Sequence, residues 1–193
     1  MRRLVLLLAL AGCASEPADL PTPAAEREAP TEAGPPETAA ADAADEAWTT
    51  EPTTLSRTAE GAATLAGVRT AMHLEAGYDR VVFDLPDGLP EVAVEYVDAP
   101  VVACGSGKRL RPEGDGVLRV RLVGARAHTE AGEATARHEP EQHGLPALRE
   151  TVLTCDFEGE VTWVLGVASP EPYRVTALAD PVRLAVDVRH PTN

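Results

Sequence analysis

The chain has 193 residues, with 17 lysine and arginine residues against 31 aspartate and glutamate residues, and a formal net charge of −14. Lysine occurs once, at Lys108, and no basic patch stands out, so the composition argues against a protein that binds nucleic acid. The length fits one folded domain with residues to spare.

The first thirteen residues have the features of an export signal. A positive start, Met1-Arg2-Arg3, precedes an apolar run over residues 4–10 that is too short to span a bilayer. Leu10-Ala11-Gly12-Cys13 resembles the bacterial lipobox, in which the cysteine becomes the first mature residue and carries acyl chains. We therefore expect a lipoprotein signal peptide over residues 1–12 and a membrane anchor on Cys13. An ordinary signal peptide with an incidental Cys13 is the alternative.

Residues 13–61 have the composition of a tether. Between residues 14 and 61 the chain is mostly Ala, Pro, Glu, Asp and Thr, with eleven acids against two arginines. Large apolar residues are nearly absent; the exceptions are Leu20, Trp48 and Leu55. Such a segment cannot bury enough apolar surface to offset its chain entropy. We expect residues 13–61 to be a disordered acidic linker and residues 62–193 to form the folded domain.

Alternation of apolar and polar residues predicts strands in the folded domain. It is clearest over residues 117–123, where Leu118, Val120 and Leu122 alternate with Arg119 and Arg121. Turn residues separate the segments, and no long amphipathic helix pattern competes. The predicted strands cover residues 79–85, 91–98, 117–123, 161–168, 173–179 and 182–189. Short strands at this spacing predict an all-β fold, an antiparallel β-sandwich or barrel.

Two of these strands repeat one pattern. Residues 80–85 and 183–188 both read Arg, three apolar residues, Asp and one apolar residue. Arg and Asp four positions apart face the same side of a strand, so each strand would have one charged and one apolar face. We expect Phe83 and Val186 in the core. The residues expected on polar sheet faces are Arg80, Asp84, Arg183 and Asp187.

Two cysteines remain once Cys13 is set aside, Cys104 and Cys155. Export places them in an oxidising compartment, where a disulfide is expected. The bridge would close a loop of about 50 residues and stabilise the fold by roughly 4 kcal/mol in the chain-entropy account. A metal site would need further ligands at short spacing, and none lie beside either cysteine.

No period holds over residues 124–148. A connection of this length in a small domain is usually functional or disordered, and binding residues are common on loops. His128, Thr129 and Glu130 open this segment and are candidate binding residues. The alternative, left open, is that His128 and Glu130 only form hydrogen bonds at the base of the loop.

Catalytic and metal-binding interpretations are weaker. Ser106, His128 and Asp156 could form a Ser-His-Asp set, but Ser106 lies between glycines without a strand-to-helix context. His128, His138 and His143 match no standard zinc spacing. We expect no catalytic residues, no cofactor and no metal; a hydrolase or metal-binding protein that uses the 124–148 loop is an alternative.

Several motifs of the predicted folded domain together point to one family. The motifs are Gly77-Tyr78-Asp79-Arg80-Val81-Val82-Phe83-Asp84-Leu85, Cys104-Gly105-Ser106-Gly107, Ala127-His128-Thr129-Glu130, Asp156-Phe157-Glu158-Gly159, Val161-Thr162-Trp163-Val164 and Arg183-Leu184-Ala185-Val186-Asp187-Val188. Together they resemble the AMIN-like domain of bacterial envelope lipoproteins, and the likeness covers about residues 65–191, nearly all of the predicted folded domain. The resemblance implies a β-sandwich and, through the related AMIN domains of envelope amidases and secretins, binding to peptidoglycan or to envelope proteins. It implies no catalytic residues.

The sequence therefore predicts a non-enzymatic binding module, exported and held at the cell envelope by its acyl chains. Peptidoglycan or an envelope protein is the expected partner, and an accessory subunit that binds no glycan is the alternative. Tyr78 and Tyr173 flank predicted strands and are candidates for contact with a glycan. Trp163 lies on an apolar strand face and is expected in the core.

Overall fold

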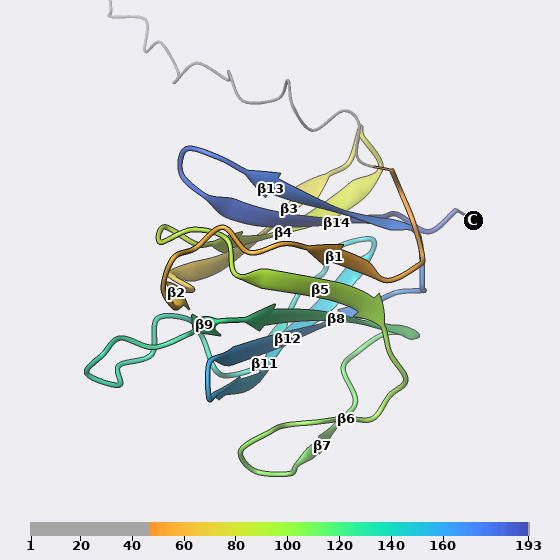
Figure 1. The fold of residues 1–193 in the computed structure, drawn as a ribbon. Helices are drawn as coiled ribbons and strands as arrows, with labels where there is room; N and C mark the ends of the chain where they lie inside the picture. The colour runs from red at the N-terminus through yellow and green to blue at the C-terminus, as the bar shows by residue number, and fades with distance from the viewer. Residues whose placement is uncertain (1–46, 193) are drawn as a thin grey trace, which may run out of the picture. The chain divides into compact units, whose positions relative to one another are not determined.

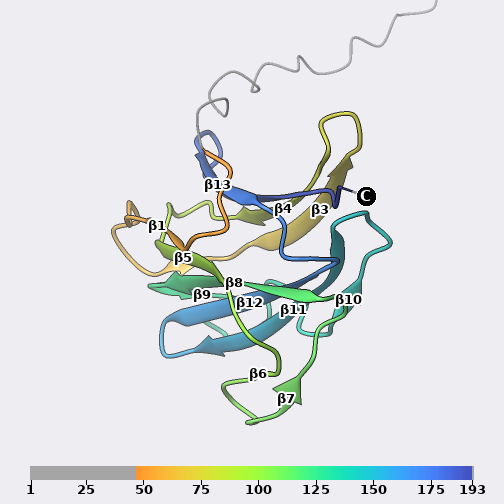
Figure 2. The ribbon, with the colours of Figure 1, turned by 90° about the vertical axis from the view of Figure 1, so that its right-hand side faces the viewer.

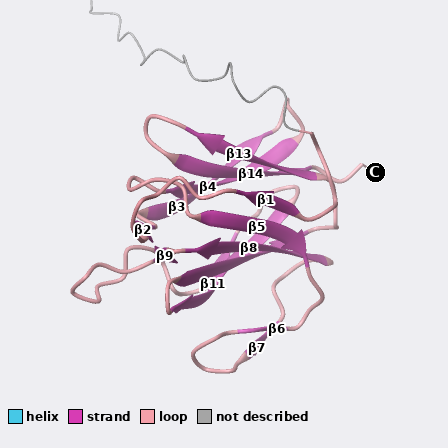
Figure 3. Ribbon diagram, in the orientation of Figure 1, coloured by secondary structure: helices cyan, strands magenta, loops and turns pink. Residues whose placement is uncertain are grey.

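The computed structural model describes residues 47–192, and the predicted signal peptide, Cys13 and most of the predicted linker lie outside this range (Figure 1). All regular secondary structure in the described range is β-strand (Figure 3). Within residues 47–192 there is no helix long and apolar enough to cross a membrane.

Residues 47–192 form fourteen strands, most of them joined by short turns. The strands are β1 Thr53–Leu55, β2 Ala63–Thr64, β3 Gly67–His73, β4 Tyr78–Asp84, β5 Glu91–Tyr96, β6 Val101–Val102, β7 Arg109–Leu110, β8 Gly116–Val123, β9 Ala125–Arg126, β10 Glu141–Gln142, β11 Leu148–Phe157, β12 Glu160–Val167, β13 Tyr173–Leu178 and β14 Arg183–Arg189.

The strands form two main sheets that face each other as the layers of a sandwich (Figures 1 and 2). One sheet has six strands in the order β1-β5-β8-β12-β11-β10, and the other has four in the order β13-β14-β4-β3. All pairings in both sheets are antiparallel. A short parallel pair, β2 with β9, and a short hairpin, β6 with β7, complete the fold. The predicted antiparallel β-sandwich is confirmed.

The core lies between the inner faces of the two sheets. Period-two alternation directs apolar side chains inward, and Leu118, Val120 and Leu122 of β8 are each 0 % exposed. Trp163 is buried as expected, and its ring meets that of Phe83 edge-on, with centroids 6.2 Å apart. One continuous apolar cluster joins both sheets.

All six predicted strands are present, but two long strands were not predicted. In β11, pairing with β12 shifts at two places, between Leu148 and Glu150 and between Leu153 and Cys155. Each shift breaks the alternation that identifies a strand in the sequence. Strand β3 lies at the edge of its sheet and none of its residues is fully buried, so it lacks a continuous apolar face.

The predicted boundary at residue 62 is wrong, because ordered structure begins earlier. Strand β1 pairs with β5 at the edge of the six-stranded sheet. Thr49 exchanges two backbone hydrogen bonds of 2.8 Å with Tyr173. The average composition of residues 13–61 conceals these pairings, although Trp48 and Leu55 are two of its three large apolar residues.

The repeated Arg-Asp pattern belongs to two neighbouring strands, β4 and β14, which run antiparallel. Their register places Asp187 opposite Arg80 and Arg183 opposite Asp84. Reversing one copy of the pattern aligns each arginine with an aspartate of the other strand. Phe83 and Val186 are each 0 % exposed, which confirms the predicted faces. Asp187 is also 0 % exposed, although it lies on the outer face, because arginine side chains cover it.

Candidate functional site

The outer face of the four-stranded sheet gathers aromatic and arginine side chains at one end. We call this group the arginine–aromatic face and define it by its members, Trp48, Tyr78, Arg80, Arg174 and Arg189. Tyr78 and Arg80 come from β4, Arg174 from β13, Arg189 from β14, and Trp48 from the segment before β1. The cross-strand register aligns Arg189 with Tyr78 and Arg174 with Asp187 and Arg80. Residues far apart in the sequence therefore meet on one surface.

The rings and guanidinium groups of this face stack on one another. The Arg189 Cζ atom lies 4.2 Å from the centroid of the Trp48 ring, and the Arg174 Cζ atom lies 4.7 Å from it. Arg174 also lies over Tyr78, at 5.2 Å. Trp48 and Tyr78 ring centroids are 5.9 Å apart. Cation–π contacts of this kind hold arginine side chains in place without removing their charge.

Asp187 fixes two of the arginines from beneath. Its carboxylate accepts hydrogen bonds from Arg80 Nε at 2.6 Å and Nη2 at 2.8 Å, and from Arg174 Nε at 2.7 Å. The hydrogen bond to Asp187 raises the pKa of the Arg80 guanidinium, although burial opposes the shift. Bidentate pairs of this type set both position and orientation.

The outer face is positively charged although the whole chain is acidic. Alternation places Arg69, Arg80, Arg174, Arg183 and Arg189 on this side, with Asp84 and Asp187 between them. Five arginines minus two aspartates leave a formal charge of +3. Arg69 donates to both oxygens of Asp84, at 3.0 and 2.7 Å, and this pairing lowers the pKa of Asp84. The face can therefore attract an anionic ligand.

Of the two tyrosines predicted to contact a glycan, only Tyr78 lies on this surface. The prediction that Tyr173 contacts a glycan is wrong, because the alternation of β13 turns this side chain inward and it is 0 % exposed. Its hydroxyl lies 2.6 Å from the Glu51 carbonyl oxygen and 2.7 Å from that of Val94. Tyr173 therefore anchors the segment before β1 to the core.

The 124–148 segment is less irregular than predicted. It contains β9 and β10, and a bridge pairs His128 with Ala134. Thr135 Oγ1 donates a hydrogen bond of 2.6 Å to the Leu65 carbonyl oxygen. The backbone therefore pairs with itself and with its neighbours, and the tip of the loop projects from the sandwich (Figure 1).

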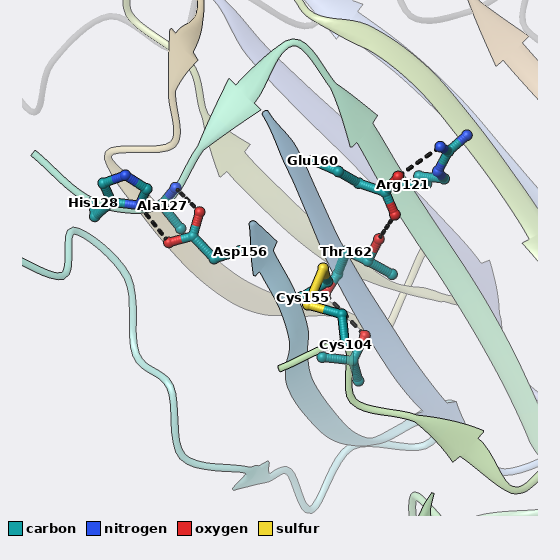
Figure 4. The surroundings of a disulfide bond; sticks show 9 residues. Cys104, Arg121, Ala127, His128, Cys155, Asp156, Glu160 and Thr162 are labelled. Carbon is teal, nitrogen blue, oxygen red and sulfur yellow. Dashed lines mark hydrogen bonds and ion pairs between the residues drawn. A yellow bond between two sulfur atoms is a disulfide. The ribbon is translucent and has the colours of Figure 1, made fainter. Parts of the chain in front are cut away.

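The residues predicted as binding candidates at the loop base make local contacts. His128 Nδ1 lies 2.7 Å from Asp156 Oδ2, and Asp156 Oδ1 accepts a 3.0 Å hydrogen bond from the Ala127 N–H (Figure 4). Glu130 lies 3.7 Å from Arg126 and is largely exposed. Thr129 Oγ1 accepts a hydrogen bond of 3.1 Å from the Glu133 N–H. These contacts agree with the alternative in which His128 and Glu130 only make contacts at the base of the loop. A binding role for the three residues stays a prediction.

The residues considered for catalysis are only partly brought together. His128 and Asp156 are paired, but Ser106 Oγ accepts a hydrogen bond from Lys108 N at 3.3 Å in its own turn. His143 lies elsewhere, with Nε2 3.0 Å from Thr151 Oγ1, and burial lowers its pKa. Within residues 47–192 no group of three or more His, Cys, Asp or Glu could hold a metal ion.

The predicted disulfide is formed. Cys104 and Cys155 are joined, with Cα atoms 5.1 Å apart, and the bridge attaches the segment between β5 and β8 to β11 (Figure 4).

Comparison with known proteins assigns the sandwich to a family. The profile of the AMIN-like domain matches residues 63–190, about two thirds of the chain. The chain belongs to the AMIN-like domain family. No curated protein and no solved structure matches it. AMIN-like domains occur in exported envelope proteins and are typically non-catalytic binding domains.

Three members of the arginine–aromatic face were not predicted from the sequence, Trp48, Arg174 and Arg189. Trp48 precedes the residues that match the AMIN-like profile. Its presence in an otherwise polar segment was the one signal that could have identified it. The two arginines carry no local signal, because their role depends on the register of β13 and β14 with β4.

Proposed function

We propose that the chain is a non-catalytic module anchored at Cys13, which binds peptidoglycan through the arginine–aromatic face. The observation that carries this proposal is the stack of Trp48, Tyr78 and the arginines on a positively charged sheet face. The family supports the coarser part of it, an envelope binding domain.

The chemistry of peptidoglycan matches this face. Its sugars present flat apolar faces on which indole and phenol rings can stack, while its peptides carry carboxylates that guanidinium groups bind. The arginines are already oriented by Asp187 and Trp48, so little side-chain entropy is lost when a ligand binds. An acidic protein with one positive face would also orient that face toward an anionic polymer.

Binding to insoluble peptidoglycan tests the proposal. The full chain with Cys13→Ser should sediment with purified wall, and Trp48→Ala and Arg189→Ala should each weaken binding about tenfold, since Trp and Arg are the residues that most often dominate interfaces. Arg183→Ala is the matched control, because Arg183 lies at the opposite end of β14. Equal binding by all four proteins would refute the site. Sedimentation of none would instead favour the accessory-subunit alternative, in which the face binds a protein.

The anchor has its own test. The wild-type protein should partition into the detergent phase, and Cys13→Ser should move it to the aqueous phase, because the acyl acceptor is gone. Ser15→Ala is the control and should partition like the wild type. If the Cys13→Ser variant still follows the detergent, Cys13 is not the anchor.

A further inference from the structure

A second surface lies on the opposite side of the sandwich, beneath a segment that we call the arm, residues 98–115. The arm connects β5 to β8 and carries the β6–β7 hairpin (Figure 2). Its Val101 and Leu110 pack on a small apolar cluster on the outer face of the six-stranded sheet. The Cys104 N–H donates a 2.9 Å hydrogen bond to the Thr154 carbonyl oxygen, and the disulfide adds a covalent link to Cys155.

Gly166 permits the arm to return close to the sheet. A Cβ atom at this position would lie 2.3 Å from the Glu113 carbonyl oxygen, closer than any side chain allows. The arm is therefore fixed at three places, by the apolar cluster, by the disulfide and by this close backbone approach.

Between the arm and the sheet lies a cavity of about 610 Å³, which is within the size range of small-ligand sites. Its floor is the outer face of β5, β8 and β12, which includes Arg119, Arg121 and Thr162. One wall is the arm, with Val101 and Val102, and the disulfide borders the cavity.

The charged groups of the floor are held in fixed positions. Arg119 Nη2 lies 2.5 Å from Glu95 Oε1, and Arg121 Nη2 lies 2.5 Å from Glu160 Oε2. Glu160 also accepts a hydrogen bond of 3.0 Å from Thr162 Oγ1 (Figure 4). Arg119 and Arg121 are two positions apart on β8, so both guanidinium groups rise from the same face.

One donor of the floor has no acceptor. Among the described residues, Arg119 Nε is buried and makes no hydrogen bond, although the Nη2 atom of the same group is paired. A buried unpaired donor is costly, so Arg119 gains a partner if its side chain turns this donor toward a carboxylate oxygen in the cavity.

The charges that line the cavity also restrict the ligand. Two arginines and three acids, Glu95, Asp98 and Glu160, leave a formal charge of −1. A polyphosphate or another polyanion would be repelled, whereas a ligand with one carboxylate and one ammonium group finds partners of both signs. Val97, Val101 and Val164 offer an apolar surface for small aliphatic side chains.

We propose that this cavity binds a short zwitterionic peptide, with its carboxylate at Arg119 and Arg121 and its ammonium group among the acids. A volume of about 610 Å³ leaves room for a few small residues. The proposal does not depend on the binding of peptidoglycan, because it concerns the other face. A wall stem peptide and the terminus of an exported protein share this chemistry, and the stereochemistry of the probe separates them.

The test is a titration of the full Cys13→Ser chain, with its disulfide intact, followed by nuclear magnetic resonance. The probes are L-Ala-L-Ala-L-Ala, L-Ala-D-Ala-D-Ala and their C-terminal amides. The Arg119 Nε–H and the Thr162 amide signals should shift and saturate with a free acid. Amidation should weaken binding about tenfold, because one charge-assisted hydrogen-bonded pair is lost. Preference for the D-peptide would indicate a wall source and preference for the L-peptide a protein source, and either result supports the site.

Amino-acid substitutions provide a second test. Arg119→Gln and Arg121→Gln should each weaken binding about tenfold, while Arg109→Gln, an exposed arm residue outside the cavity lining, should not. Circular dichroism establishes that each variant is folded. The amidated probes test the proposal with every cavity residue unchanged, so that result does not depend on the folding of a variant. Absence of saturable shifts with every probe, equal affinity for acid and amide, or tighter binding of tripolyphosphate at the same residues would each overturn the proposal.

Discussion

The outer faces of the two sheets are both built from antiparallel strands, but they differ in charge and in shape. On the four-stranded sheet, arginines and aromatic rings stack directly on the strands and leave a solid, positively charged surface. On the six-stranded sheet, Arg119 and Arg121 are each paired with a glutamate, and a disulfide-held arm borders an open cavity whose lining has a formal charge of −1. The first face suits a large anionic polymer, and the second suits a small ligand with both charges.

The contrast has a simple origin in how charge is placed. Asp187 forms ion pairs with two arginines, so positive charge remains on the four-stranded face. On the six-stranded face, Glu95 and Glu160 form an ion pair with one arginine each, and Asp98 adds a further negative charge. Similar residues therefore give surfaces of different charge when their ratio changes.

Removing the charge of Asp187 should disrupt the arginine contacts of the four-stranded face and lower stability more than the other substitutions considered below. Asp187→Asn leaves Arg80 and Arg174 without their shared carboxylate and should lower the free energy of unfolding by about 3 kcal/mol. Urea denaturation measures this change. Asp84→Asn on the same face is the control, with an expected loss below about 1 kcal/mol, because the Arg69–Asp84 pair is more exposed. Equal losses would mean that Asp187 has no special role.

Removing the disulfide should affect the six-stranded face alone. The Cys104→Ala, Cys155→Ala double variant should lose about 2 kcal/mol, less than the roughly 4 kcal/mol of the chain-entropy account, because residual structure in the unfolded chain reduces that effect. Peptide binding in the cavity should weaken several-fold, while the contribution of Trp48 and Arg189 to peptidoglycan binding should not change. The opposite pattern, with wall binding lost and peptide binding retained, would exchange the roles of the two faces.

The loop base should show the smallest effect. His128→Ala removes the contact with Asp156 and should cost about 1 kcal/mol, while His138→Ala, at an exposed position, should change stability by less than about 0.5 kcal/mol. Neither substitution should alter wall binding. If His128→Ala reduces wall binding with stability unchanged, the loop base is a binding site after all.

How well the sequence predicts each strand depends on whether the alternation of apolar and polar residues continues without interruption along it. Strands with regular alternation, such as residues 117–123, were predicted almost to the residue, because the core requires one apolar face. Strand β11 was missed, because its two register shifts break the period. The disulfide could be predicted from the compartment and from the number of cysteines, without knowledge of the fold.

The candidate site was harder to predict. Tyr78 was identified from its position beside a strand, but the same reasoning failed for Tyr173, which the register turns inward. Trp48, Arg174 and Arg189 converge only through pairings between strands distant in sequence. The Arg-Asp pattern was visible in the sequence, but it did not reveal that the two copies are neighbours in opposite directions.

The two tryptophans of the chain allow the central claim to be tested with an internal control. Trp48 lies on the arginine–aromatic face, and Trp163 is 2 % exposed in the core. Soluble peptidoglycan fragments should be titrated into the Cys13→Ser chain while the two indole N–H signals are followed. The Trp48 signal should shift and saturate while the Trp163 signal stays in place. A stationary Trp48 signal at fragment concentrations that saturate binding to the chain would contradict the central claim.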